Sequence, residues 1–372
     1  MISQIPPSTL KLLPDFGNWG LALSIFILPL TISWWSVWYP VSEPGGGSYV
    51  AQRILASRSE KDALGGTLFF NVAHYSLRPW PWILVALSSI LVYPTLDDIA
   101  RAFPYLDRSL IGHDTAYSAM LVFLPHGVLG LMVAGLLAAY VSTIPTHPNW
   151  GTSYLVHDLY RRFIRPDADE RHYVMMGRIV TALLMVFAAG MTFLLQTART
   201  GFELLLSIGA GSGLLYLLRW YWWRINAWSE IAAMAVSFAV AVSFFAAGQL
   251  GMVFPPNTAF LVTVFGTTFA WIATTLLTRP ENENTLVGFY RLVRPAGPGW
   301  GPIPAKAGVG PSPDSISTQL LGWVLGCAFV YATLFGAGSA LYGHTTQAVV
   351  WGLVWLVSGA GLLRVISSLW RA

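Results

Sequence analysis

Two hydroxyl side chains stand next to each other inside the apolar segment "GLLAAYVSTIPTHPNWG". On an α-helix Ala139, Ser142 and Thr143 occupy positions i, i+3 and i+4, so one backbone carbonyl and two hydroxyl oxygens share a face. Hard cations prefer clustered oxygen ligands. Pro145 lacks an N–H, which should free a carbonyl near Val141 and end or kink the helix there. This spacing suggests a cation site beside a helix interruption.

A structural explanation of the same residues stays open. The hydroxyls of Ser142 and Thr143 could donate to carbonyls one turn earlier. Gly135, Ala138 and Ser142 could form a small-residue face that packs against another helix. Spacing alone favours this explanation over the ion site.

The composition decides the class of protein that holds these residues. Hydrophobic residues make up 55% of the chain and charged residues only 10%, which excludes an ordinary soluble domain and indicates an integral membrane protein. The net charge of +4 is spread over loops, which argues against nucleic acid as a partner. Cys327 is the only cysteine, so no intramolecular disulfide can form.

We expect about nine transmembrane helices, because a spanning helix needs roughly 20 mainly apolar residues. Helices are the expected spanning structure, since backbone groups find no water in lipid. The fold class is therefore all-α, a polytopic membrane protein. The expected spans are residues 18–38, 63–93, 117–143, 173–196, 202–220, 228–248, 259–277, 319–341 and 348–369.

The basic residues predict the orientation in the plasma (cell inner) membrane. Lys and Arg gather after the first and third spans and in later alternate connections, which should be cytoplasmic, together with the C-terminus. The N-terminus then lies outside, although the first residues contain no signal sequence that could export it. This suggests that upstream spans are missing.

Three regions follow from this pattern. Residues 1–278 should form the membrane core, and residues 319–372 two C-terminal transmembrane helices. Residues 279–318 are rich in Pro and Gly and predict a cytoplasmic, partly disordered linker, in which "TLVGFYRLVRP" lies on the membrane surface.

Three stretches resemble the sodium/solute symporter family, whose members carry sugars, proline, pantothenate, sialic acid and iodide. The longest stretch is "DTAYSAMLVFLPHGVLGLMVAGLLAAYVSTIPTHPNWGTSYLVHDLYRRF". Its "LPHGVLGL" entry, adjacent hydroxyls and "NWGTSYLVHDLY" exit look like the family's signature region. The other two stretches are "YVAQRILASRS" and "RWYWWRINAWSEI".

The resemblance implies a partial leucine-transporter-type fold. In the family, ten core helices form two inverted repeats, and the first five spans here match core helices six to ten, the second repeat. The first repeat would be absent. The matching sodium ligands are the carbonyl of Ala139 and the hydroxyls of Ser142 and Thr143, so Na⁺ is the expected coupling ion. Pro145 stands where relatives with a further sodium site carry a hydroxyl, so a single sodium is expected.

The resemblance also points to a substrate position in the first span. Trp34 and Trp38 match the stretch that packs beside a bound solute, and aromatic faces suit such a site. Tryptophans are equally common as anchors at the membrane interface, so both roles remain open. Pro29 should break this span near its middle.

His74 and Arg78 stand one turn apart deep within the second span. An ionisable residue at this depth usually faces a cavity or a partner, which would place Arg78 near an ion or substrate path. The alternative, which we favour, is that Pro79 and Pro81 bring Arg78 to a helix end, where it bonds to carbonyls.

No catalytic constellation is visible, so the chain is not expected to be an enzyme. We expect a sodium-coupled symporter of a small organic solute such as a sugar, amino acid or carboxylate, working by alternating access. The alternatives are a non-transporting membrane sensor or partner module, and the truncated half of a split transporter. Expected partners are the solute, the lipid bilayer and a separately encoded N-terminal half.

Overall fold

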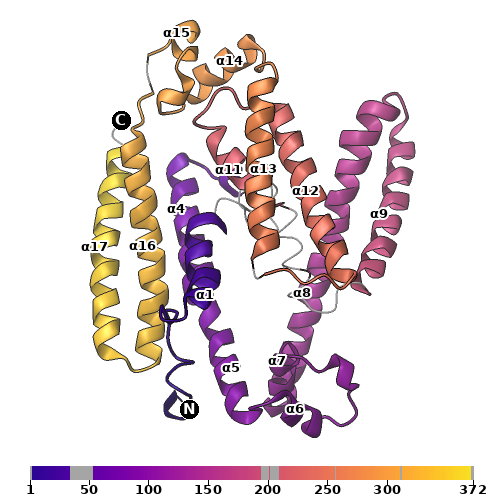
Figure 1. The fold of residues 1–372 in the computed structure, drawn as a ribbon, viewed down its shortest axis with the longest axis vertical. Helices are drawn as coiled ribbons and strands as arrows, with labels where there is room; N and C mark the ends of the chain where they lie inside the picture. Colours follow the sequence, from indigo (N-terminus) through magenta and orange to yellow (C-terminus); the bar gives the residue numbers. More distant parts are fainter. Residues whose placement is uncertain are drawn as a thin grey trace. The chain divides into compact units, whose positions relative to one another are not determined.

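Most of the described residues are helical, and the described ranges contain no strand. A computed structural model describes residues 2–33, 53–193, 201, 209–255, 257–310 and 312–369. It divides into two compact units, one formed by Met1–Leu84 with Phe202–Ala372 and the other by Val85–Gly201 (Figure 1). The all-α prediction is confirmed by this helical content.

Six helices in the described ranges are long and apolar enough to cross a membrane. A seventh span is possible, because Glu60–Val92 and Leu96–Ala102 pass the same criterion together and are bent by 77° at their junction. The apolar helix Trp19–Ile32 is shorter, and the expected span 202–220 is described only from residue 209, where it contains a seven-residue helix, Ser212–Leu218. The count of nine is therefore not confirmed. The six spans are His126–Ile164, Glu170–Thr192, Ala227–Gln249, Thr258–Leu277, Ile316–Leu341 and Thr345–Ser368.

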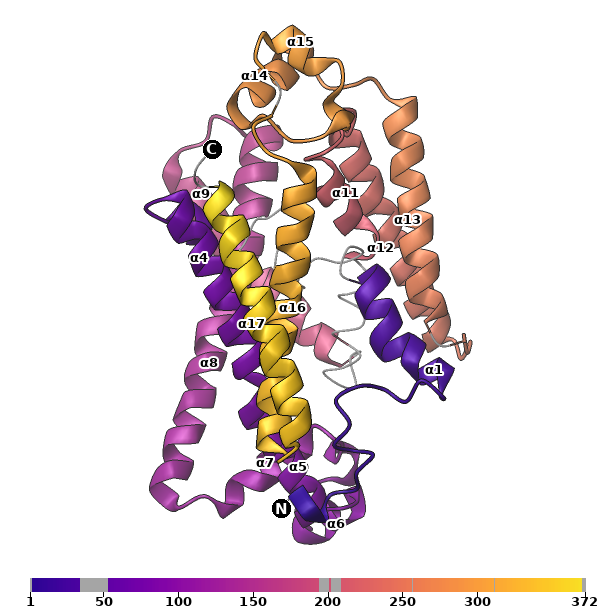
Figure 2. The ribbon, with the colours of Figure 1, turned by 90° about the vertical axis from the view of Figure 1, so that its left-hand side faces the viewer.

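In the first unit, a helical segment packs on the pair α16 (Ile316–Leu341) and α17 (Thr345–Leu369), which run side by side in Figures 1 and 2. The segment consists of α4 (Glu60–Asn71), the wider π-turns of η4 (Val72–Leu77) and the start of α5 (Pro79–Val92). Ser76 Oγ donates to the carbonyl of Val330 over 2.8 Å. Trp80 is 5% exposed and lies so close to Gly338 that the glycine has no room for a Cβ.

The helices α11 (Ser212–Leu218), α12 (Ala227–Gln249) and α13 (Thr258–Leu277) form a second cluster in the same unit. Leu215, Tyr216, Ala233 and Trp271 make its buried core. Thr275 Oγ1 donates to Ser229 Oγ over 2.7 Å, which joins α13 to the first turn of α12. This buried hydroxyl pair satisfies polar groups that lipid could not.

Residues 279–318 are more ordered than their composition predicts. They contain α14 (Glu283–Val293) and α15 (Ile303–Ala307), which lie against each other in Figures 1 and 2. Trp300 is buried, stacks on Phe289 at 5.4 Å between ring centroids, and donates from Nε1 to the carbonyl of Trp220 over 2.9 Å. These aromatic side chains bury apolar area and hold the two helices together, whereas the partly disordered, cytoplasmic character of the linker stays a prediction.

The second unit is built around a helical hairpin. The helix α8 (His126–Ser153) continues into π-turns, η7 (Tyr154–Ile164), and α9 (Glu170–Thr192) packs beside it. The hydroxyls of Thr152 and Thr181 meet at 2.8 Å between the two helices. Tyr173 donates to the carbonyl of Arg165 over 2.6 Å and fixes the turn.

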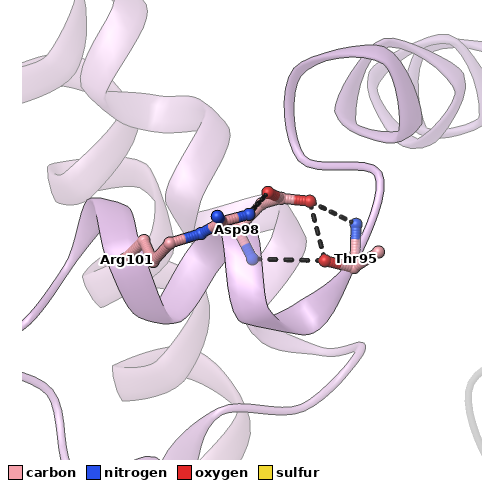
Figure 3. Close-up of polar contacts among 3 residues, drawn as sticks. All are labelled: Thr95, Asp98 and Arg101. Atoms are coloured by element: carbon pink, nitrogen blue, oxygen red, sulfur yellow. Dashed lines mark hydrogen bonds and ion pairs between the residues drawn. The ribbon is translucent and has the colours of Figure 1, made fainter.

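A charged connection precedes this hairpin and contains the short helices α6 (Leu96–Ala102) and α7 (Thr115–Met120). Figure 3 shows the start of α6, where Thr95 and Asp98 form a capping box and Asp98 also pairs with Arg101. The hydrogen bonds from the Thr95 hydroxyl, and then from its N–H, hold the pKa of Asp98 below its usual range.

Candidate ion site

The helix that carries the hydroxyl pair does not end at Pro145. It continues as α8 through Pro145 and Pro148 to Ser153, so of the two predicted effects, an end or a kink, the end is excluded. A proline has no N–H, so the helix loses one hydrogen bond, the one to the carbonyl four residues earlier, and the other backbone hydrogen bonds can remain. The carbonyl of Val141 therefore loses its usual α-helical donor, as the sequence indicates.

Side chains just beyond Pro145 bond back to the carbonyls of the hydroxyl pair. Thr146 Oγ1 donates to the carbonyl of Ser142 over 2.7 Å. His147 Nδ1 lies 2.9 Å from the carbonyl of Thr143, which can only accept, so Nδ1 carries the proton. These two bonds support the backbone of the turn from which Ser142 and Thr143 project.

The hydroxyls of Ser142 and Thr143 remain available to a ligand. Both residues are exposed, and neither hydroxyl makes a hydrogen bond to any residue that the structure describes. The structural explanation expected Ser142 and Thr143 to donate to carbonyls one turn earlier. In the structure Thr146 makes a bond of this kind, to the carbonyl of Ser142. Ala139 is exposed as well, and its carbonyl keeps one lone pair beyond the helical bond.

Ala139, Ser142 and Thr143 lie on one face of α8, as their spacing requires. Together they offer three oxygens, whereas a hard cation takes about six. Further ligands would have to come from another element. Sequence reasoning identified these three residues but missed Thr146 and His147, whose four-residue spacing from the hydroxyl pair was the available signal.

The candidate substrate residues Trp34 and Trp38 lie outside the described residues, so their role stays a prediction. The part of their span that is described runs from α1 (Trp19–Ala22) through the π-turns η2 (Leu23–Ile27) and η3 (Pro29–Ser33). Pro29 therefore lies within a run of wider turns that begins before it, at Leu23, and the helix does not end there.

His74 and Arg78 contact each other, at the point where η4 joins α5. Arg78 Nη1 lies 2.7 Å from His74 Nδ1, and its guanidinium lies 4.7 Å from the ring centroid of Trp82. Arg78 stands at a helix junction, as expected. Its guanidinium contacts the rings of His74 and Trp82, whereas we expected it to bond to backbone carbonyls. The role of Trp82 was missed, although it stands four residues after Arg78.

These features define a class of protein. In the described ranges, six apolar helices are long enough to cross a membrane, and one of them carries two adjacent exposed hydroxyls. An integral multi-pass membrane protein is what the six apolar helices support.

The chain belongs to the sodium:solute symporter family, whose model matches residues 22–238. That range includes Ala139, Ser142, Thr143, His74 and Arg78. Relatives in this family are transporters rather than enzymes.

Curated relatives match only part of their own length. The sodium/glucose cotransporter of Vibrio parahaemolyticus is 25% identical over 53% of this chain and 38% of the relative. The human sodium/myo-inositol cotransporter 2 is 26% identical over 55% of this chain and 33% of the relative. The high-affinity proline transporter PutP of Bacillus subtilis is 30% identical over 37% of this chain and 30% of the relative. No solved structure matches the chain. The chain thus spans well under half the length of these relatives.

Proposed function

We propose that the protein takes part in sodium-coupled symport of a small organic solute. The observation that carries the proposal is the family match over residues 22–238, which contains an exposed and unbonded hydroxyl pair on α8. In this proposal the carbonyl of Ala139 and the hydroxyls of Ser142 and Thr143 supply part of the sodium shell.

Sodium would act by stabilising one state of the transporter. An ion that binds the outward-open state more tightly shifts the population toward it, and the solute then enters a site that is already formed. Movement of one bundle of helices against another would carry both inward. Since Pro145 offers no side-chain oxygen next to the pair, we assign one sodium per cycle.

One sodium is enough to drive accumulation. Moving one charge through 100 mV supplies about 2.3 kcal/mol, or roughly fifty-fold accumulation of a neutral solute. The names of the relatives suggest two chemical classes of solute, neutral sugars or polyols and an amino acid. In line with the basic loops, we place the protein in the plasma (cell inner) membrane with a cytoplasmic C-terminus.

Two other functions remain as alternatives. The chain could be one half of a split transporter that works with a separately encoded N-terminal half, or a membrane sensor or partner module that does not transport. Co-expression with a separately encoded N-terminal half tests the split transporter, and a missing sodium dependence of uptake in every preparation favours the sensor.

The test is isotope uptake into proteoliposomes that contain the chain alone or the chain with such an N-terminal half. Labelled glucose, myo-inositol and proline are supplied under an inward sodium gradient, with an equal potassium gradient as control. We expect uptake of at least one solute to depend on sodium. Uptake that is equal in both gradients, or absent in both preparations, would contradict symport.

A further inference from the structure

Arg78 carries a fixed positive charge in the middle of an apolar helical segment. At about 1.5 Å per residue it lies about 27 Å from Glu60 and about 21 Å from Val92, the two ends of that segment. A guanidinium does not lose its proton in proteins. A charge at this depth is costly in lipid and is normally matched by a partner or a polar cavity.

The described contacts of Arg78 leave this charge without a counter-charge. They are His74 Nδ1 at 2.7 Å and the ring of Trp82 at 4.7 Å, and no acidic side chain among the described residues pairs with it. Arg78 can only donate, so His74 Nδ1 accepts and the imidazole is neutral, with its proton on Nε2. Phe70 stacks on this ring at 4.9 Å and fixes its orientation.

The cationic cluster faces away from the helices that hold the segment. Ser76 and Trp80 are 0% and 5% exposed and pack on α16. Arg78 and Trp82 are exposed, Trp82 to 50%. On a helix, positions 78 and 82 lie roughly opposite positions 76 and 80. The charge thus lies on the face of the segment opposite to the face that packs on α16.

We propose that Arg78 binds the carboxylate of the transported solute, with His74 as the residue that positions the guanidinium. This proposal rests on the symport function above and names its substrate class. A carboxylate matches the planar fork of donors on arginine. A neutral sugar or polyol would leave the charge unpaired, so the site favours solutes with a carboxylate.

Arg78 variants separate this proposal from a structural role. The full-length chain, purified in detergent, is titrated with C2–C6 carboxylates that include proline and lactate, and with the amide of each, and its thermal midpoint is recorded. We expect carboxylates alone to stabilise the wild type. Arg78→Gln should weaken their apparent affinity about ten- to a hundredfold, whereas Arg178→Gln, at an exposed arginine of α9, should not change it.

His74 is tested by a pair of substitutions. His74→Gln keeps an oxygen that can accept from Arg78, whereas His74→Phe keeps a ring and loses the acceptor. We expect the Phe variant to weaken carboxylate binding and the Gln variant to restore it, with the maximal rate of uptake unchanged in both. Equal affinities in these two variants would remove the positioning role.

The proposal is overturned if no carboxylate stabilises the wild type, if amides stabilise it equally, or if Arg78→Gln binds carboxylates as tightly as the wild type. If Arg78→Gln does not fold, carboxylate binding is measured on Arg78→Lys, and the comparison of carboxylates with amides on the wild type decides whether the proposal stands. The two proposals can fail separately. Carboxylate binding that needs Arg78 but not sodium would refute symport alone, and sodium-driven uptake unaffected by Arg78→Gln would refute the carboxylate site alone.

Discussion

The hydroxyl groups of α8 fall into two kinds. Thr146 donates to the carbonyl of Ser142, and Thr152 pairs with Thr181 on α9, so both have their hydrogen bonds within the protein. Ser142 and Thr143 make no such bond to described residues, and they stand next to each other. Two adjacent hydroxyl oxygens without another bond can both serve as ligands of a cation.

Substitutions at Thr143 can separate its oxygen from its shape. Thr143→Val is close in shape and lacks the oxygen, so we expect about tenfold weaker sodium binding, whereas Thr143→Ser should bind nearly as the wild type does. The measurement is the sodium dependence of the thermal midpoint, with potassium at constant ionic strength. Ser153→Ala, at an exposed hydroxyl about three turns later on α8, is the matched control. Equal sodium affinity in the Val and Ser variants would contradict a hydroxyl ligand.

At the scale of elements, the fate of Pro145 shows why one residue type is a weak guide to a helix end. Its local chemistry could be predicted, because a proline always removes the donor to the carbonyl four residues back. Its structural consequence could not, because the neighbouring turns keep their bonds and Thr146 and His147 add two more. Local supports of this kind are invisible until side chains are placed.

Hydropathy predicted the long helices well and the connections poorly. Spans such as 228–248 and 319–341 lie within helices α12 and α16 almost to the residue, since lipid imposes both length and composition. The helices of residues 279–318 could not be predicted from Pro and Gly content, because they are held by Tyr290 and Trp300, which pack together at 5.8 Å between ring centroids. The contact of Arg78 with Trp82 likewise depends on side-chain direction.

The contact between Trp80 and Gly338 predicts a sharp difference between two glycines of α16. A Cβ at position 338 would overlap the ring of Trp80, whereas a Cβ at position 326 has open space. Gly338→Ala should lower the free energy of unfolding by about 1–3 kcal/mol, and Gly326→Ala should leave it nearly unchanged. Unfolding in mixed micelles measures both. Similar values for the two variants would show that Trp80 does not pack there.

The capping box of α6 predicts a dependence of stability on pH. Since the pKa of Asp98 is lowered on folding, its carboxylate stabilises the fold above the unfolded pKa of about 3.9, and this contribution is lost as pH falls through the lower folded pKa. Thr95→Ala removes the main cause of the shift. We therefore expect the difference in thermal midpoint between wild type and Thr95→Ala to be constant from pH 7 to 5 and to shrink below about pH 4. A difference that grows on acidification would contradict this assignment.

At the scale of the whole molecule, the family match covers a shorter part of the chain than the described helices do. The match ends at residue 238, within α12, whereas α13, α16 and α17 lie beyond it. The pair α16 and α17 nevertheless packs on η4, inside the matched range, through Ser76 and Trp80. The unmatched helices thus support the segment that presents His74 and Arg78.

The central claim is that the hydroxyl pair of α8 holds sodium, and equilibrium binding of ²²Na⁺ to the purified full-length chain tests it most directly. The wild type should bind the isotope saturably, displaced by unlabelled sodium but not by potassium. The double variant Ser142→Ala with Thr143→Ala should lose this binding and keep its helical circular dichroism. If the double variant binds ²²Na⁺ as tightly as the wild type, the ion lies elsewhere and the account of this site is wrong.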